Sequence, residues 1–364
     1  MIDMNCVPYI DLLRSLVRIP SPSFGEKECA DFLQRWLEER GMDPRRIGNN
    51  LVCLSSRFDP GKRTLALDAH IDTVPAADSY TRDPHDPGTD RDIVYGLGSN
   101  DDGGCVVSSI ASFRHFFDTP LPINLMLILS CEEERSGPGG SRLLFSENGP
   151  FAKGELPHPD WAIVCEPTSL KAAISERGLL VLDGTAYGVS GHAARDEGVN
   201  ALYIAMDDIQ RLRAHSFKRV SPSMGKVRLN VTCINAGSAH NVIPDKCSFT
   251  VDIRPTEQYD NAEILDELQA LCKSTLTARN LSNRSSATRP GSALLAAADK
   301  LGLECFSSPT TSNWMRMDCD CIKLGPGDSS RSHKADEYIL SSEIEQGIDT
   351  YIKFIEAFYG DTLE

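Results

Sequence analysis

Short apolar segments that alternate with helical ones are the feature that most constrains the fold of this chain. Apolar runs of strand length and segments of helical periodicity follow one another at residues 9–19, 27–40, 51–54, 64–69, 123–131 and 161–165. Strands that alternate with helices along a chain imply an α/β sheet. The pattern predicts an α/β fold, whose ligands would gather at the carboxyl ends of the strands.

The order of the predicted elements changes near residue 175. A strand, a helix, two strands and a helix are expected at residues 179–189, 198–213, 227–235, 246–254 and 261–276, and the polar stretch 277–290 is interpreted as a linker. A helix, two strands and a closing helix follow at residues 292–301, 304–307, 320–324 and 341–359. A chain of 364 residues is too long for one ordinary core. We therefore expect one domain from residues 1–176 and 286–364, and an inserted β-α-β-β-α domain at 177–285.

Composition excludes several classes of protein. The formal charge of −15 argues against binding to nucleic acid or to an anionic membrane. Twelve cysteines without a repeating spacing, no signal segment and no long apolar stretch favour a cytoplasmic protein with reduced thiols. Cys319 and Cys321 form a close pair, but no second pair completes a structural zinc site.

An apolar strand ending in His-x-Asp is the first motif with chemistry. Residues i and i+2 of a strand point the same way, so His70 and Asp72 would share one face. This arrangement suits a metal-bound imidazole held by a carboxylate. Taken alone, it also fits a structural histidine beside a loop aspartate.

Acidic residues follow other predicted turns and strands. In the run from Gly96 to Gly104, Asp101 occupies the third glycine position of a dinucleotide turn, where it would repel a pyrophosphate and could instead bind a metal. Three glutamates at 132–134 follow a buried strand, which is costly unless cations compensate them. Alternatively, the glycine-rich run that contains Asp101 is a surface turn, and the three glutamates are the solvated start of a helix.

Two further fragments complete the set. Glu166 ends another apolar strand, and His333 follows a Gly-Pro-Gly loop at residues 325–327. Two histidines and three or four carboxylates converging on one sheet edge would suit a pair of zinc ions.

These fragments, in this order, resemble the zinc amidohydrolases that include acetylornithine deacetylase, succinyl-diaminopimelate desuccinylase, carboxypeptidase G and the aminoacylases. The resemblance spans nearly the whole chain and implies a mixed-sheet catalytic domain with an inserted α+β lid or dimerisation domain. It also implies roles for individual residues: Asp101 as the bridging ligand, Glu134 and His333 at one metal, His70 and Glu166 at the other, Asp72 as the group that orients His70, and Glu133 as general base. The family places a cis peptide after its bridging aspartate, here Asp101–Asp102.

The resemblance extends to the inserted domain. His192 matches a Gly-His motif whose histidine reaches the partner subunit's active site and steadies the oxyanion, which implies a homodimer. Asn241 and Arg254 match positions that bind a substrate carboxylate in carboxypeptidase G. Without the resemblance, His192 and Arg254 would be interpreted as a structural and a surface residue.

The chain departs from the family pattern at two positions. Gly103 replaces a basic residue, and Asn313 replaces the aspartate of a Ser-Asp pair. We expect both to lie near the substrate pocket and to bear on acyl or side-chain preference.

The resemblance implies hydrolysis of the amide bond of a small N-acyl amino acid, with two zinc ions per subunit, or cobalt or manganese in their place. N-acetylornithine deacylation in arginine biosynthesis is the first expectation, with N-acetylcitrulline or an N-succinyl analogue as near relatives. A dipeptidase or a lysine-pathway hydrolase of the same family is the enzymatic alternative. A non-catalytic binding protein on this fold is the remote one.

Overall fold

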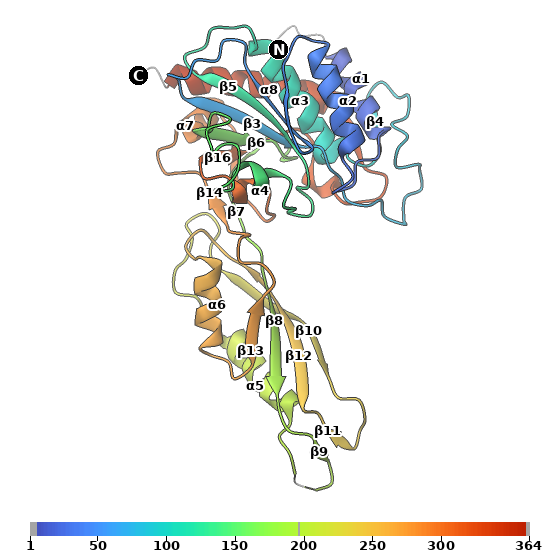
Figure 1. The fold of residues 1–364 in the computed structure, drawn as a ribbon, viewed down its shortest axis with the longest axis vertical. Helices are drawn as coiled ribbons and strands as arrows, with labels where there is room; N and C mark the ends of the chain where they lie inside the picture. The colour runs from blue at the N-terminus through green and yellow to red at the C-terminus, as the bar shows by residue number, and fades with distance from the viewer. Residues whose placement is uncertain (1–5, 196, 362–364) are drawn as a thin grey trace. The chain divides into compact units, whose positions relative to one another are not determined.

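A computed structural model describes residues 6–195 and 197–361 and divides them into two compact units (Figure 1). The first unit holds the chain up to Ile174, Thr288–Phe306 and the chain from Ser312 onward. The second holds Ser175–Ala287 and Ser307–Thr311, and it contains the predicted insert.

A mixed β-sheet organises the first unit. Its strand order is β1-β2-β5-β3-β6-β16-β7-β14, and β15 also pairs with β7. The strands are β1 (Arg45–Ile47), β2 (Asn50–Leu54), β3 (Thr64–His70), β5 (Asn124–Ser130), β6 (Trp161–Val164), β7 (Ala172–Glu176), β14 (Ser286–Ala287), β15 (Cys305–Ser308) and β16 (Asp320–Lys323). The central strands β5, β3, β6 and β16 are parallel, so their carboxyl ends share one edge.

Both faces of this sheet are covered by hydrophobic cores. Every residue of β3 and β5 is buried. The helices are α1 (Val7–Val17), α2 (Lys27–Glu38), α3 (Gly104–Phe116), α4 (Ser141–Leu144), α7 (Ala293–Lys300) and α8 (Ser341–Asp361), with a 3-10 turn η2 (Asn313–Arg316). One face forms the main core with α1, α2, α3, α7 and α8, and Figure 1 shows α3 and α8 running along the sheet. A smaller core on the other face includes Leu144 of α4 and Trp314 of η2.

A short ribbon outside the sheet joins distant parts of the first unit. Strand β4 (Ile93–Tyr95) pairs antiparallel with β17 (Tyr338–Leu340). This pairing brings the turn η1 (Ser99–Gly103) close to the segment that follows η3 (Ser329–Arg331).

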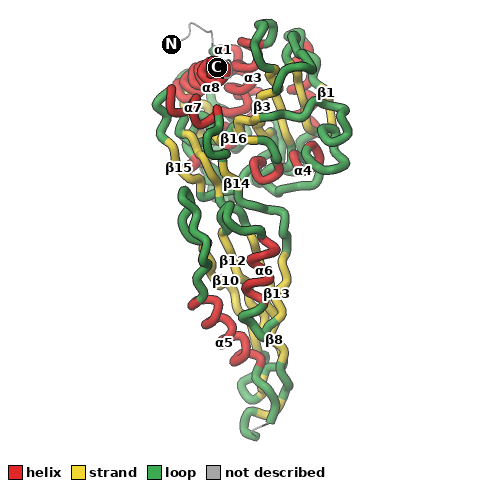
Figure 2. Tube along the Cα trace, turned by 90° about the vertical axis from the view of Figure 1, so that its left-hand side faces the viewer, coloured by secondary structure: helices red, strands yellow, loops and turns green. Residues whose placement is uncertain are grey.

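The second unit is a sheet covered on one face by helices, which Figure 2 shows lying along its strands. The strand order is β10-β12-β8-β13. Its elements are β8 (Leu180–Tyr187), β9 (Gly191–His192), α5 (Ala201–Ala214), β10 (Arg228–Ala236), β11 (Val242–Ile243), β12 (Lys246–Arg254), α6 (Asn261–Gln269) and β13 (Thr275–Ala278). Alternate residues of β8 and β12 pack against both helices, and the opposite face carries polar side chains. The predicted fold class, a mixed α/β domain with a smaller α+β domain, is confirmed.

One predicted helix is too long. The helix expected at 261–276 ends at Gln269, and Thr275 already belongs to β13, which pairs with β8. The chain turns between them because Asp208 of α5 accepts hydrogen bonds from the backbone of Lys273 and Ser274. The stretch expected as a linker, 277–290, includes the end of β13 and all of β14. None of the helices in the described residues has the length and apolar character needed to cross a membrane.

Candidate metal centre

Parallel strands deliver the acidic and histidine residues to one edge of the first unit. His70 is the last residue of β3 and pairs in register with Ser130, the last residue of β5. The three glutamates follow Ser130 directly, and Glu166 comes two residues after the end of β6. The loop that contains Asp101 and the loop that contains His333 reach the same edge.

Three groups of potential metal ligands form there. The ligand atoms of each group lie within 4.8 Å of one another: His70, Glu133 and Glu166; His70, Asp101 and Asp102; and Asp101, Glu134 and His333. All five residues expected as metal ligands are therefore brought together. Asp101 occurs in a group with each histidine, which is the position that a bridging ligand requires.

His70 is buried between two carboxylates. Its Nε2 lies 3.2 Å from Oδ1 of Asp101, and its Nδ1 lies 3.0 Å from the carbonyl oxygen and 3.5 Å from Oδ1 of Asp72. Burial by itself lowers the pKa of His70, but the hydrogen bonds to Asp101 and Asp72 outweigh it and raise that pKa well above its usual value. The ring is thus oriented by Asp72 with Nε2 toward Asp101.

His333 lies on the more open side of the cluster. Its Nε2 is 2.9 Å from Oε2 of Glu134 and 3.7 Å from Oδ2 of Asp101. The hydrogen bond to Glu134 raises the pKa of His333 to about 9. His333 has φ +60°, a conformation that side-chain-bearing residues seldom adopt and that functional sites often impose.

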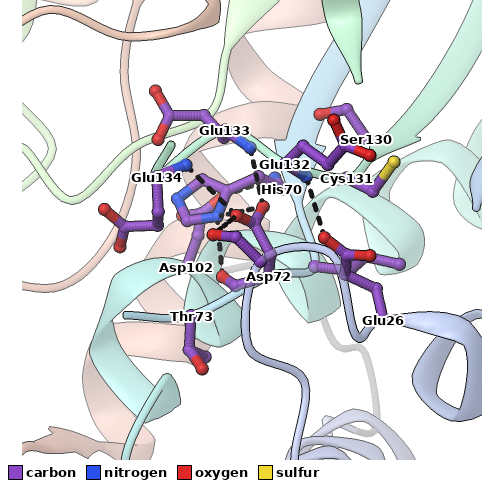
Figure 3. Close-up of polar contacts among 12 residues, drawn as sticks. Glu26, His70, Asp72, Thr73, Asp102, Ser130, Cys131, Glu132, Glu133 and Glu134 are labelled. Carbon is purple, nitrogen blue, oxygen red and sulfur yellow. Dashed lines mark hydrogen bonds and ion pairs between the residues drawn. The ribbon is translucent and has the colours of Figure 1, made fainter. Parts of the chain in front are cut away.

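Asp72 also fixes the acidic loop after β5 (Figure 3). Its carboxylate accepts hydrogen bonds from the backbone N–H groups of Glu133 (2.9 Å) and Glu134 (3.1 Å), and from the hydroxyl of Ser23 (2.7 Å). The sequence predicted its contact with His70 but gave no signal for these bonds.

The three consecutive glutamates have different surroundings. The carboxylate of Glu132 accepts a hydrogen bond from the Gly139 backbone at 2.7 Å. A Cβ atom at Gly139 would lie 2.4 Å from Oε1 of Glu132, so this glycine allows the loop to close around that carboxylate. Glu132 is therefore occupied within its own loop, whereas Glu133 and Glu134 each belong to a group of potential ligands.

The cluster holds more negative than positive charge. Burial, followed by the charge of Glu166, raises the pKa of Glu133 well above its usual value. Burial also raises the pKa of Asp102, and Glu166 and Asp101 contribute to the rise. Divalent cations would remove this repulsion, and imidazole and carboxylate groups are the ligands that zinc accepts. The residues present therefore fit a metal pair.

A buried carboxylate that the sequence did not single out supports the loop of Asp101. Glu337 is 2% exposed, and it accepts hydrogen bonds from the backbone N–H groups of Gly98 (3.1 Å), Asn100 (2.8 Å) and Asp101 (2.8 Å). The predicted cis peptide between Asp101 and Asp102 is present. The only sequence signal for Glu337 was an acidic pair shortly after His333.

The two departures from the family pattern are both buried. Asn313 donates hydrogen bonds to Oδ2 of Asp68 (3.0 Å) and to Ser130 (2.8 Å) beneath the strand ends. A Cβ atom at Gly103 would lie 2.5 Å from Leu13 of α1, so this position packs against a helix. Asn313 thus supports the strand ends from within the unit, whereas Gly103 lines a cavity together with His70, Asp72 and Asp102.

Three predicted residues lie in the second unit. His192 is exposed on β9, which pairs with β11, and the Ala193 backbone donates to the carbonyl of Asn241 at 3.0 Å. Arg254 ends β12, whose first residue Lys246 lies about 26 Å away at the usual rise of a strand. The structure therefore places His192 beside Asn241 and separates both from Arg254, which forms a two-point ion pair with Asp252.

Comparison with known proteins identifies relatives of the whole chain. The family model described as the peptidase dimerisation domain of M20 peptidases matches residues 174–279. An acetylornithine deacetylase of Pectobacterium carotovorum is 28% identical over 372 residues, which cover 92% of this chain and 94% of that protein. Succinyl-diaminopimelate desuccinylase 2 of a Ruegeria species is 25% identical over 386 residues, which cover 98% of this chain and 96% of that protein.

A solved structure from Bacillus subtilis, described as a dinuclear metal binding peptidase of the M20 family, has the same fold. Its TM-score is 0.72 at 16% identity, and the match covers 97% of each chain. The chain is therefore similar to hydrolases over nearly its whole length, and it contains a peptidase dimerisation domain of the M20 type. This confirms the resemblance predicted from the sequence and the expectation of an enzyme.

Proposed function

We propose that this protein is a zinc-dependent deacylase of small N-acyl amino acids. The observation that carries the proposal is that Asp101 shares one group of potential ligands with His70 and another with Glu134 and His333. Two ions could thus be held side by side, with Asp101 between them, Glu134 and His333 at one, and His70 and Glu166 at the other. When bound, such ions would lower the pKa of a coordinated water toward about 7 and polarise the substrate carbonyl.

Glu133 is the residue proposed to move protons. Its backbone is fixed by Asp72, and its carboxylate lies in the group that contains His70 and Glu166. From there it can accept the proton of the attacking water and return it to the nitrogen of the leaving amine. Burial and the charge of Glu166 raise the pKa of Glu133 in the protein without metal, which favours the binding of a proton.

Replacement of Glu133 by glutamine tests this role. Glu133→Gln should keep the bound metal, measured by atomic emission, and lose turnover by several orders of magnitude. Glu132→Gln is the matched control in the same loop, because that carboxylate is bonded to Gly139. Turnover retained in Glu133→Gln, or lost equally in Glu132→Gln, would remove Glu133 from this role.

The substrate class rests on the relatives and on one arginine. The acetylornithine deacetylase and the desuccinylase both match more than nine-tenths of the chain. We propose N-acetylornithine, or a near relative such as N-acetylcitrulline or an N-succinyl amino acid, as substrate, with a place in arginine biosynthesis. Arg254 would hold the substrate carboxylate through two hydrogen bonds, a geometry that it already makes with Asp252.

A substrate panel tests this proposal. Zinc-loaded protein should hydrolyse N-acetylornithine or N-acetylcitrulline with a higher kcat/KM than succinylated amino acids and dipeptides. A preference for dipeptides would instead assign the chain to the peptidase activity named for its solved relatives.

The second unit is proposed to form a homodimer. It matches a peptidase dimerisation domain, and β10 lies at one end of the strand order of its sheet. Ile234 of β10 is 50% exposed, and Tyr203 and Met206 on one side of α5 are 65% and 45% exposed. An unpaired strand edge and apolar side chains of this kind are typical of surfaces that pair with a second copy.

His192 is proposed to act on the active site of the partner subunit, where it would stabilise the oxyanion. Asn241 lies beside it and would act in the same site.

Mixed dimers test the role of His192. Loss of one oxyanion donor costs about 2.7–4 kcal/mol, so His192→Ala should lose about 10²–10³ in kcat. Subunits carrying His192→Ala and Glu133→Gln should recover roughly a quarter of wild-type activity when mixed equally, because half of the dimers then hold one complete site. No recovery after subunit exchange would place His192 outside the partner's site.

A cytoplasmic location is proposed from the cysteines. None of the twelve forms a disulfide within the described residues, which is typical of proteins from a reducing compartment.

A further inference from the structure

A cluster of three sulfur atoms lies apart from the metal centre, at the start of β16. The Sγ of Cys321 is 3.6 Å from the Sγ of Cys319 and 3.8 Å from the Sδ of Met317. Cys321 lies in β16, Cys319 lies at a bend directly before that strand, and Met317 follows η2. The proposed hydrolysis uses none of them.

We propose that Met317, Cys319 and Cys321 form a binding site for a soft monovalent cation, copper(I). Two sulfur ligands that each lie about 2.3 Å from a metal ion, at the tetrahedral angle, are about 3.8 Å apart. The two separations in this cluster are thus already close to those of a metal-bound set. A copper ion would need only small side-chain movements.

The donor set selects the type of cation. Thiolate and thioether sulfurs prefer copper(I), whereas magnesium and calcium require oxygen ligands. A structural zinc site needs four nitrogen or sulfur ligands. Among the described residues, the groups of three or more metal-ligating His, Cys, Asp or Glu residues do not include either cysteine. The nearby His158 is paired with Asp318 at 2.9 Å.

The surroundings allow an ion to enter and be retained. Met317 is 2% exposed and Cys321 is fully buried, so these two sulfurs form the closed end of the site. Cys319 is only partly buried and would be the point of entry. Binding of one copper(I) releases the two thiol protons and leaves a net charge of −1 on the cluster. The guanidinium of Arg289, which donates to the carbonyl of Asp318 at 3.1 Å, lies beside this segment and offsets that charge.

A disulfide is the competing chemistry for two close thiols. It requires a sulfur separation of about 2.05 Å and a Cα separation of about 4.4–6.8 Å. The Sγ atoms of Cys319 and Cys321 are 3.6 Å apart, which is far from the length of a disulfide and close to the separation of two sulfurs bound to one ion.

Competition for copper tests the proposal on the full chain, reduced and already loaded with zinc. Copper(I) is titrated under argon against a coloured copper(I) chelator. Wild type should retain one equivalent that Cys319→Ser and Cys321→Ser lose. Met317→Leu should bind at least about tenfold more weakly, the lower limit of what loss of even a supporting contact costs a metal site. Copper-edge X-ray absorption of wild type should show sulfur ligands only.

Cys233→Ser and Cys305→Ser are matched controls, because both thiols are exposed and lie elsewhere. They should retain copper as wild type does. Because Cys321 is in the core, thermal unfolding is used to check that Cys321→Ser folds. If Cys321→Ser does not fold, Cys319→Ser still tests the site, because Cys319 is only partly buried. Equal copper binding by wild type and Cys319→Ser overturns the proposal. It is equally overturned if the reduced protein takes no copper while air oxidation converts the 319–321 thiols to a disulfide.

Discussion

Replacement of Glu337 by glutamine is the sharpest test of how the metal centre is supported. Oε1 of Glu337 accepts from Asn100 and Asp101, and Oε2 accepts from Gly98. Glutamine keeps one oxygen and turns the other into an NH₂ group that faces a backbone N–H. One hydrogen bond to a charged acceptor is lost and a buried donor is left unsatisfied, at a cost of about 2–3 kcal/mol.

The protein can relieve this conflict by moving the loop that carries Asp101. Metal binding requires the loop to return, so the cost should appear in the affinity for zinc, as a loss of about 30- to 140-fold. The apo protein should lose less stability, because burial raises the pKa of Glu337 to about 7, so part of the apo protein already carries a neutral side chain there. The zinc dissociation constant is measured by competition with a fluorescent chelator, and the stability of the apo protein by thermal unfolding.

Glu343→Gln is the matched control. Glu343 also accepts a backbone N–H, from Leu340 at 2.9 Å, and pairs with Arg331, which lies outside the Asp101 loop. Its variant should bind zinc as wild type does. A zinc affinity of Glu337→Gln within about threefold of wild type would refute the view that these bonds hold Asp101 in place.

Two further predictions concern the second unit. Asp208 is buried, and although burial by itself raises its pKa, hydrogen bonds from Ser274 and Lys273 lower it below the usual value. Asp208→Asn should therefore lower the free energy of unfolding at pH 7 by about 2–3 kcal/mol, measured in urea. This difference from wild type should shrink as the pH falls below about 4, because the stabilisation is lost when Asp208 becomes protonated. A difference that stays constant down to about pH 3 would contradict this assignment. For the proposed dimer, Ile234→Lys should shift sedimentation toward the monomer, whereas Val220→Lys, which changes an equally exposed residue away from β10 and α5, should not; a dimer that survives Ile234→Lys would exclude this edge.

The sequence predicted best those features that depend on the type of residue in a short segment. Apolar runs predicted β3 and β5 because strands buried on both faces can tolerate few polar residues. The histidines and acids at the strand ends were predicted because parallel strands share an edge. The end of α6 was missed because it depends on Asp208, a residue on another helix. Nothing in the local pattern of residues 261–276 marks that contact.

The buried support of the metal centre could not be predicted for the same reason. Asp72 bonds to the backbone of Glu133 and Glu134, more than sixty positions away, and Glu337 bonds to Gly98, Asn100 and Asp101, more than two hundred positions away. Backbone N–H groups are the same for every residue type, so no sequence pattern identifies them as partners.

These two carboxylates divide the support of the site between them. Asp72 ties the end of β3 to the loop after β5, and so sets His70 relative to Glu133 and Glu134. Glu337 ties the Asp101 loop to the segment that follows His333. Asp101 and Glu134 belong to one group of potential ligands with His333. Glu337 fixes the first of these two ligands, and Asp72 fixes the second. Loss of either support should therefore weaken the ion at His333, whereas only loss of Asp72 should also disturb the orientation of the His70 ring.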